Sequence, residues 1–462
     1  MTKRRILYMP IETKARELLG KAFLAARAAE KGWIVVMGAQ PDTRIYMRHF
    51  PPGVWVENSI PDRKIGRLSK MQKDGHRVVN LCEESIFYTS AEDYCARKLG
   101  AAALEFTDQV LAPGERNASH IRTHRPGSDN KVQVTGNPRF DILQPSLRCV
   151  YNEKAEAIRE KYGPFILANT NFPRVNPFDR GVDLIDLWHT RGIINSGSEL
   201  DFLREHAAFK RRHMEGFQAL LKDLAASGLK ERIILRPHPG ECHDVWHEWV
   251  KGTNVDIHFE GSANDWILAA EAVLHPGCTT GAEAVMLDRP SFSFVPEPDS
   301  PFVNQPDLAS QWVTSAEEFV QGFNKVRGLT REQLRESYVT QRETLKFYIV
   351  NMEEPYSADR ILDSLEDLDT TVVTLEQLGL TEGLWPKVKR ALDPRRSVRQ
   401  KNRRLARQKT KLAEERSSRG MQKLGDIHED EIKKPLAQWV ETGALQRLPQ
   451  LSRLTDQLWA VH

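Results

Sequence analysis

The sequence predicts an α/β protein built from two consecutive doubly wound domains, each a mostly parallel sheet covered by helices on both faces. Two observations predict this fold class. Short apolar runs alternate with amphipathic helical patterns from residue 5 to about residue 345. A turn at Gly136-Asn-Pro-Arg139, followed by a stretch to about Pro145 that is typical of a hinge, divides the alternation into two series.

The first series opens with a buried-strand pattern, Arg5-Ile-Leu-Tyr-Met-Pro10, and a helical pattern over 14–31 that Gly32 ends. A strand over 33–37 follows and is closed by Gly38. The remaining expected elements are a helix over 63–73, a strand over 77–81, a helix over 91–99 and a strand over 109–111. This series defines a first domain over 1–150.

The second series defines a domain over 151–345. It begins with a strand over 164–168 and contains a long amphipathic helix over 200–227 that Gly228 caps. Further strands are expected over 232–236, 255–259, 272–275 and 291–295, with a short helix over 266–271.

The rest of the chain differs in charge. The whole sequence carries a net charge of +3, yet 387–423 alone has fifteen Lys and Arg against three acidic residues, a local charge of +12. All other residues together therefore carry −9. We expect a helical segment over 346–380 that packs back on the domains, and a basic helical extension over 381–462.

Composition excludes several classes. Hydrophobic residues make up 40% and charged residues 28%, which excludes a broadly disordered chain. No run of about 18 apolar residues exists, and the amino terminus lacks the apolar stretch of a secretory signal. Five cysteines without a CxxC pair are typical of reduced thiols. We therefore expect a cytoplasmic protein.

The first motif that could carry chemistry is Arg236-Pro-His-Pro-Gly-Glu241, at the carboxyl end of a predicted strand. Ligands of open α/β sheets bind beyond this edge. Arg236 and His238 form a cationic pair suited to a phosphate, and Pro239 stiffens the loop. The alternative is a buried histidine that caps a loop.

The second motif, His275-Pro-Gly-Cys-Thr-Thr-Gly-Ala-Glu-Ala284, also follows a strand and opens a helix. Gly277 allows close backbone approach, Thr279 and Thr280 offer hydroxyls, and Glu283 could accept hydrogen bonds from sugar hydroxyls. The motif is neither a P-loop nor a GxGxxG fingerprint. Alone it could be a structural turn, but beside the first motif it predicts a two-sided phosphate cradle.

Metal binding is a competing interpretation for part of this region. His243 and His247 have the i, i+4 spacing of zinc ligands, with His238 and Cys242 nearby in the sequence. No acidic third ligand or second cluster supports a site, so we expect neither a metal nor a cofactor.

Together these motifs resemble the GT-B glycosyltransferases, whose two Rossmann-like domains face each other across an interdomain cleft. The chain resembles more closely the bacterial surface carbohydrate biosynthesis proteins, relatives of β-Kdo transferases and of bacterial sialyl- and polysialyltransferases. Matching segments are Pro10-Ile-Glu-Thr-Lys-Ala-Arg-Glu17, Thr135-Gly-Asn-Pro-Arg-Phe-Asp141 and Ile166-Leu-Ala-Asn-Thr-Asn-Phe172. The resemblance covers about residues 5–345 and implies an acceptor domain followed by a nucleotide-sugar donor domain.

The resemblance also implies residue roles. His238 would contact the phosphate of a CMP-activated acidic sugar, a task that Thr279 and Thr280 would share. The acidic pair of the family falls on Glu83 and Glu84, one of which would take the proton of the acceptor hydroxyl. Ser85 stands where the family has Gly, which leaves the aim of the pair open, and a solvated acidic turn is the alternative.

Two further positions are expected to matter. Asn169 and Asn171 lie where a retaining enzyme would need a carboxylate nucleophile, so their amides could instead hold the phosphate or carboxylate of the donor. Asp141 is a weaker catalytic candidate, for which we favour helix capping.

The predicted function is transfer of a sugar, most simply a CMP-activated Kdo or nonulosonic acid, to a glycan or lipid-linked acceptor in bacterial surface polysaccharide biosynthesis. Alternatives are a CDP-alditol phosphotransferase, a UDP-sugar enzyme such as a 2-epimerase, and a non-enzymatic scaffold on a membrane or nucleic acid. The basic segment over 387–423 could simply be a solvated, charged helix. As a functional element it favours a peripheral position on anionic lipid over nucleic acid, because it lacks interleaved aromatic residues.

Overall fold

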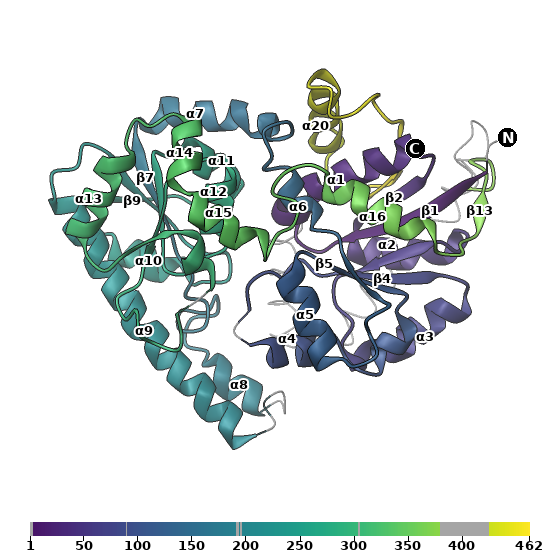
Figure 1. Ribbon diagram of the computed structural model, residues 1–462, viewed down its shortest axis with the longest axis horizontal. Coiled ribbons are helices and arrows are strands. Elements are labelled where there is room, and N and C mark those ends of the chain that lie inside the picture. Colours follow the sequence, from purple (N-terminus) through teal and green to yellow (C-terminus); the bar gives the residue numbers. More distant parts are fainter. Residues whose placement is uncertain (1–2, 89, 191–193, 195, 304, 379–424) are drawn as a thin grey trace. The chain divides into compact units, whose positions relative to one another are not determined.

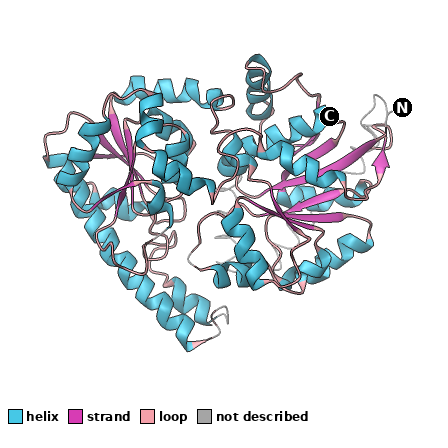
Figure 2. Cartoon of the chain, in the orientation of Figure 1, coloured by secondary structure: helices cyan, strands magenta, loops and turns pink. Residues whose placement is uncertain are grey.

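The computed structural model describes all residues except 1–2, 89, 191–193, 195, 304 and 379–424 (Figure 1). The chain divides into two compact units. Unit 1 comprises residues 1–150 and 346–462, and unit 2 comprises residues 151–345. Each unit contains a twisted sheet with helices on both faces, so two Rossmann-like doubly wound folds are present, as the sequence predicts (Figure 2).

The sheet of unit 1 has the order β14-β15-β2-β1-β3-β4-β5-β6, and the strands from β2 to β6 are parallel. The parallel strands are β1 (Arg4–Ile11), β2 (Ile34–Ala39), β3 (Val54–Glu57), β4 (Arg77–Leu81), β5 (Gln109–Ala112) and β6 (Val132–Val134). They are almost wholly buried, which explains their continuous apolar runs. A short strand, β13 (Val372–Val373), pairs with β1.

The helices of unit 1 lie on both sides of its sheet (Figure 1). They are α1 (Lys14–Glu30), α2 (Gln40–Tyr46), α3 (Ile65–Lys73), α4 (Ala91–Lys98), α5 (Glu115–His124), α6 (Pro138–Asp141), α16 (Ser357–Glu366) and α20 (Asp430–Glu441). Gly20 lets α1 approach α6 closely, since a Cβ there would lie 2.7 Å from the backbone nitrogen of Arg139. The expected hinge over 136–145 is thus a packed part of unit 1.

The carboxyl terminus corrects the expectation of a helical extension over 381–462. After α20 the chain forms two strands, β14 (Leu451–Thr455) and β15 (Leu458–Val461), and β15 pairs antiparallel with β2. α20 is anchored by Trp439, which is buried, packs edge-to-face against Phe23 and donates a hydrogen bond to the Leu147 carbonyl. Hydrophobic burial therefore makes this end part of unit 1. The basic segment over 387–423 lies outside the described residues.

Unit 2 has a parallel sheet of order β12-β11-β10-β7-β8-β9. Its strands are β7 (Phe165–Asn169), β8 (Arg232–Arg236), β9 (Val255–Ile257), β10 (Ala272–His275), β11 (Ser291–Phe294) and β12 (Gln311–Val313). Its helices are α7 (Asn152–Tyr162), α8 (Leu184–Thr190), α9 (Gly197–Ala226), α10 (His243–Trp249), α11 (Ala263–Ala269), α12 (Thr280–Met286), α13 (Ala316–Val326), α14 (Arg331–Ser337) and α15 (Val339–Lys346). Among the described residues, no helix has both the length and the apolarity needed to cross a bilayer.

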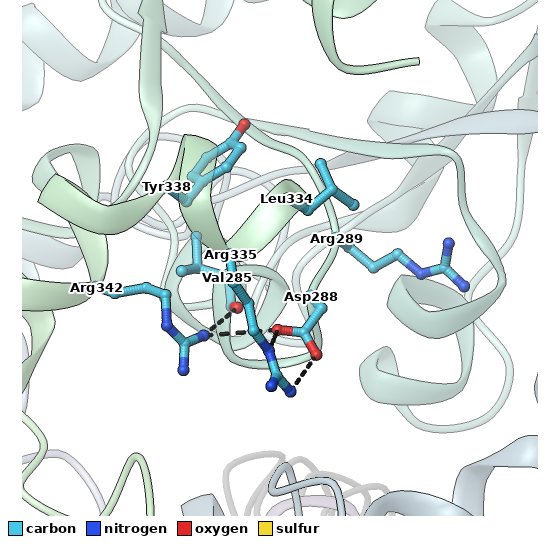
Figure 3. Close-up of a pocket in the computed structure, with 7 residues that line it drawn as sticks. All are labelled: Val285, Asp288, Arg289, Leu334, Arg335, Tyr338 and Arg342. Atoms are coloured by element: carbon cyan, nitrogen blue, oxygen red, sulfur yellow. Dashed lines mark hydrogen bonds and ion pairs between the residues drawn. The ribbon is translucent and has the colours of Figure 1, made fainter. Parts of the chain in front are cut away.

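A buried carboxylate joins the last helices of unit 2 to α12 (Figure 3). Asp288 follows α12 with a positive φ of 54°, and its carboxylate accepts two hydrogen bonds from Arg335, at 2.8 and 2.9 Å. Arg342 lies 3.6 Å from the same carboxylate. The two arginines come from α14 and α15, so this cluster fixes the end of α12 and has an architectural role.

Asp141 has a similar role in unit 1. Its fully buried carboxylate accepts hydrogen bonds from the backbone nitrogens of Ser357 and Ala358, at 2.8 and 3.0 Å, and from Asn351 Nδ2 at 2.6 Å. It therefore caps α16, so the capping interpretation is confirmed, although the helix capped is distant in the sequence. Burial raises the pKa of Asp141 to about 7 against these hydrogen bonds.

This raised pKa predicts a pH-dependent stability. The folded state holds the Asp141 proton more tightly than the unfolded chain, so the stabilisation is full below pH 3.8 and is lost as the pH rises towards 7. We expect the unfolding free energy of wild type minus that of Asp141→Asn to fall across this window, by at most about 1.4 kcal/mol per pH unit. Denaturant unfolding from pH 4 to 8 measures it.

The matched control is Asp367→Asn, at the exposed carboxyl end of α16. The unfolding free energy of wild type minus that of Asp367→Asn should stay constant over the same pH range. A flat difference for Asp141→Asn as well would contradict the assignment.

Candidate functional site

The order of strands in unit 2 marks one place where a ligand can enter. From β7 the chain proceeds to β8 and β9 on one side and then crosses to β10, β11 and β12 on the other. The loops that leave β7 and β10 therefore diverge at their carboxyl ends, and ligands of open α/β sheets bind at such a switch point. Both predicted phosphate motifs and the Asn169–Asn171 segment lie at this edge.

The loop after β7 contacts both motifs. Asn171 Nδ2 donates a 2.7 Å hydrogen bond to the Gly277 carbonyl in the loop after β10. The Thr170 hydroxyl accepts a 2.9 Å hydrogen bond from the backbone nitrogen of His238 in the loop after β8. Asn169 is buried, and its Nδ2 has no hydrogen-bond partner among the described residues. A buried amide donor without a partner is costly, so this group is suited to a ligand acceptor.

Glu241, the last residue of the first motif, holds these loops together. Its wholly buried carboxylate accepts hydrogen bonds from Thr170 Oγ1 and the Phe172 backbone nitrogen, each at 2.7 Å, and from Trp246 Nε1 at 2.6 Å. Burial raises the pKa of Glu241 and outweighs the hydrogen bonds from these donors, which act to lower it. In the sequence, the only signal for this role of Glu241 is its place at the end of the first motif.

The orientation of His238 follows from this loop. Its Nδ1 accepts a 3.0 Å hydrogen bond from the Gly240 backbone nitrogen, so the neutral ring carries its proton on Nε2. The side chain is half-buried, whereas Pro239 is exposed. An Nε2–H group on a braced loop at the switch point can donate to an anionic oxygen.

Arg236 is positioned differently from the expected phosphate fork. Its Nη1 and Nη2 donate to the carbonyls of Glu260 and Gly261, at 3.0 and 2.7 Å, and its guanidinium lies over the Phe259 ring. Burial lowers the pKa of Arg236 to about 10. These contacts place it as a brace for the loop after β9, and direct contact with phosphate stays a prediction.

The buried His275 side chain fixes the turn of the second motif through hydrogen bonds. Its Nδ1 accepts from the backbone nitrogens of Gly277 and Cys278, at 3.2 and 3.1 Å, and its Nε2 faces Ser310 Oγ at 2.8 Å. Burial lowers the pKa of His275 to about 3, so the ring is neutral. Gly277 has a φ of 75°, and a Cβ on Gly281 would overlap the His275 ring, so both glycines are needed for this turn.

The hydroxyls of the second motif lie where this turn meets α12. Thr279 and Thr280 are both partly buried. Thr280 Oγ1 has no hydrogen-bond partner among the described oxygen and nitrogen atoms and faces the Cys278 thiol. Glu283 is buried one turn into α12. These two hydroxyls lie at the same edge of the sheet as the first motif, as the sequence predicts.

Lys210 in α9 is a residue that the sequence analysis missed. It is buried, its Nζ lies 3.4 Å from the Pro276 carbonyl, and its charge faces the rings of Phe172 and Phe209 at 5.9 Å. Burial lowers the pKa of Lys210 to about 8. Lys210 therefore adds positive potential next to the second motif. No sequence signal distinguishes it from the other lysines of an amphipathic helix.

In unit 1 the two predicted carboxylates have different surroundings. Glu83 is buried, and its Oε2 lies 3.3 Å from Asn137 Nδ2, while its carbonyl accepts from Arg139. Burial raises the pKa of Glu83, with Lys21 and Arg16 acting in the opposite direction. A carboxylate with a raised pKa is a better proton acceptor at neutral pH.

Glu84 is half-exposed and forms ion pairs with Arg16, at 3.6 Å, and with Lys98. The Ser85 hydroxyl donates a 2.7 Å hydrogen bond to the Cys82 carbonyl, so Ser85 closes this turn. Of the pair, Glu83 is the buried carboxylate with a raised pKa, whereas Glu84 matches the alternative of a solvated acidic turn.

Within the part of the chain that the structure describes, no group of three His, Cys, Asp or Glu side chains could hold a metal ion. His243 Nε2 instead faces the His238 carbonyl at 3.2 Å.

No family model and no curated protein matches this chain. Solved structures that are similar to this chain include the UDP-GlcNAc 2-epimerase of Methanocaldococcus jannaschii bound to UDP-GlcNAc and UDP. It has 13% sequence identity and a TM-score of 0.48, and the match covers 78% of this chain and 99% of that one. S. aureus MnaA with UDP has 13% identity and a TM-score of 0.48, covering 82% and 98%. The wall teichoic acid polymerase TagF has 12% identity and a TM-score of 0.46, covering 78% and 87%. At these scores the likeness assigns no substrate to this chain.

The role of Glu241 predicts the effect of replacing it. In Glu241→Gln an amide NH₂ would face N–H and O–H donors, leaving at least one buried donor unpaired. We expect a loss of about 1–3 kcal/mol in unfolding free energy, measured by denaturant titration. Glu248→Gln is the control, since Glu248 lies on the exposed face of α10 with Arg180, and its unfolding free energy should stay close to that of wild type. Equal stabilities for the two variants would refute the bracing role.

Proposed function

We propose that this protein is a GT-B glycosyltransferase that transfers a CMP-activated acidic sugar to an acceptor in bacterial surface glycan biosynthesis. One observation carries the proposal: the loops after β7, β8 and β10 are bonded to one another at the switch point of unit 2 and present donors suited to a phosphate. In the sequence these donors form the two motifs on which the resemblance to this enzyme class rests.

In this proposal His238 Nε2–H, Thr279 and Thr280 bind the phosphate of the donor. Asn169 Nδ2, which lacks a partner in the described structure, donates to an oxygen of the donor, while Asn171 holds the loop at Gly277. Arg236 and Lys210 act at longer range, by bracing a neighbouring loop and by adding positive potential. Such donors stabilise the charge that develops on a phosphate leaving group.

The reaction then needs one base. The acceptor hydroxyl oxygen would form a bond to the anomeric carbon as the bond from that carbon to the phosphate oxygen breaks, and CMP would leave with the electron pair. Glu83 would take the hydroxyl proton. Its burial and raised pKa suit this role better than the paired, half-exposed Glu84.

The proposal predicts that CMP binds the full chain. A ligand that binds only the folded state raises the unfolding free energy, by about 2.7 kcal/mol at a hundred times its Kd. We expect a CMP-dependent rise in Tm, and at least a tenfold weaker CMP affinity by calorimetry in His238→Ala because a phosphate donor is lost. His189→Ala, on the exposed end of α8, should bind like wild type.

UDP and CDP are the comparison ligands. Stabilisation by UDP or CDP without stabilisation by CMP would refute the donor, and equal CMP binding by His238→Ala and wild type would refute the site.

A further inference from the structure

A second polar cluster lies at the corresponding edge of unit 1. From β1 the chain proceeds to β2 on one side and then to β3 on the other, so the switch point of this sheet lies between β1 and β3. Glu57 is the last residue of β3 and is wholly buried there. Three cations surround its carboxylate: Arg44 from α2, Lys64 from the 3₁₀ helix η2 (Asp62–Lys64) and Arg67 from α3.

Two of these cations already neutralise and bind Glu57. Lys64 Nζ and Arg67 Nη2 each lie 2.7 Å from its carboxylate oxygens, and Trp55 Nε1 donates to it at 2.9 Å. Burial acts to raise the pKa of Glu57, but Lys64 and Arg67 outweigh it and lower the pKa, so the carboxylate is ionised. Lys64 also donates to the Ser59 carbonyl and hydroxyl, which uses its three N–H groups.

Lys64 and Arg67 already bind the Glu57 carboxylate, so binding of Glu57 does not explain why Arg44 is also present. Its side chain makes no hydrogen bond among the described residues; its Nη2 lies 3.6 Å from Glu57, and its Nε is buried without a partner. Burial lowers the pKa of Arg44, and the charge of Arg67 lowers it further, so the two guanidinium groups repel each other. An anion between them would relieve that repulsion.

The cluster is both positive and accessible. Glu12 is the second carboxylate whose charge acts on Arg44 and Lys64, so three cations face two carboxylates, an excess of one positive charge. The side chains of Arg44 and Arg67 are 33% and 30% exposed. Arg67 uses Nη2 on Glu57, which leaves other N–H groups of both forks for a ligand.

We propose that Arg44 and Arg67 form an anion subsite that binds a phosphate group of the protein's second substrate. Two guanidinium forks match the oxygens of a phosphate and can bind it bidentately. Calling that substrate the acceptor rests on the function proposed above. The anion site itself rests only on the geometry of unit 1.

Inorganic phosphate is the probe, titrated by calorimetry at low ionic strength into the full chain. The parent for this experiment is His238→Ala, which removes a phosphate donor from unit 2. We expect Arg44→Gln in that background to weaken phosphate binding at least tenfold, and Arg44→Lys to weaken it less because the charge stays but the fork is lost. Arg63→Gln, an exposed neighbour in η2, should bind phosphate within twofold of the parent.

The circular dichroism and Tm of each variant show whether it is folded. A folded Arg44→Gln variant that binds phosphate as tightly as its parent would overturn the proposal. Glucuronate is the comparison anion, and a His238→Ala parent that binds glucuronate but no phosphate would also overturn the proposal. If Arg44→Gln fails to fold, Arg44→Lys with unchanged phosphate affinity overturns it. CMP titration of wild type is a separate measurement, so failure of the donor assignment leaves the phosphate result interpretable.

Discussion

The candidate site of unit 2 depends on one buried carboxylate. Glu241 accepts hydrogen bonds from the loop after β7 and from Trp246 of α10. In that loop, the Thr170 hydroxyl donates to Glu241 and accepts a hydrogen bond from the backbone nitrogen of His238. A buried carboxylate without these donors would be strongly destabilising, so the loops and the carboxylate require one another. Because of this network, His238 is held in one orientation on a rigid scaffold, which is what a phosphate-binding donor needs.

Both sheets concentrate polar groups at the same topological position. In unit 2 the switch point between β7 and β10 holds amides, hydroxyls and a histidine, whereas in unit 1 the switch point between β1 and β3 holds arginines around Glu57. Under the proposed function, the donors of unit 2 would bind a leaving group whose charge grows, whereas the guanidinium pair of unit 1 would bind an anion that is permanently charged. The proposed function accordingly assigns the donor to unit 2 and the acceptor to unit 1.

Strands covered on both faces could be predicted well, since β4, β8 and β10 have the bounds that their apolar runs indicate. β3 is only four residues long and follows two prolines, so its pattern was too short to identify. The terminal hairpin was missed because charge, not alternation, dominated the interpretation of that region. Motif residues were located at the correct strand ends, but the roles of Glu241 and Lys210 depend on partners 71 and 66 positions away in the sequence, which periodicity cannot reveal.

The most direct test is a crystal structure of the full chain with CMP bound. The account predicts the phosphate in unit 2, with an oxygen about 3 Å from His238 Nε2 and within hydrogen-bonding reach of Thr279 or Thr280. It also predicts that the hydrogen bonds of Glu241 stay in place. A phosphate bound away from the loops after β7, β8 and β10 would contradict the central claim.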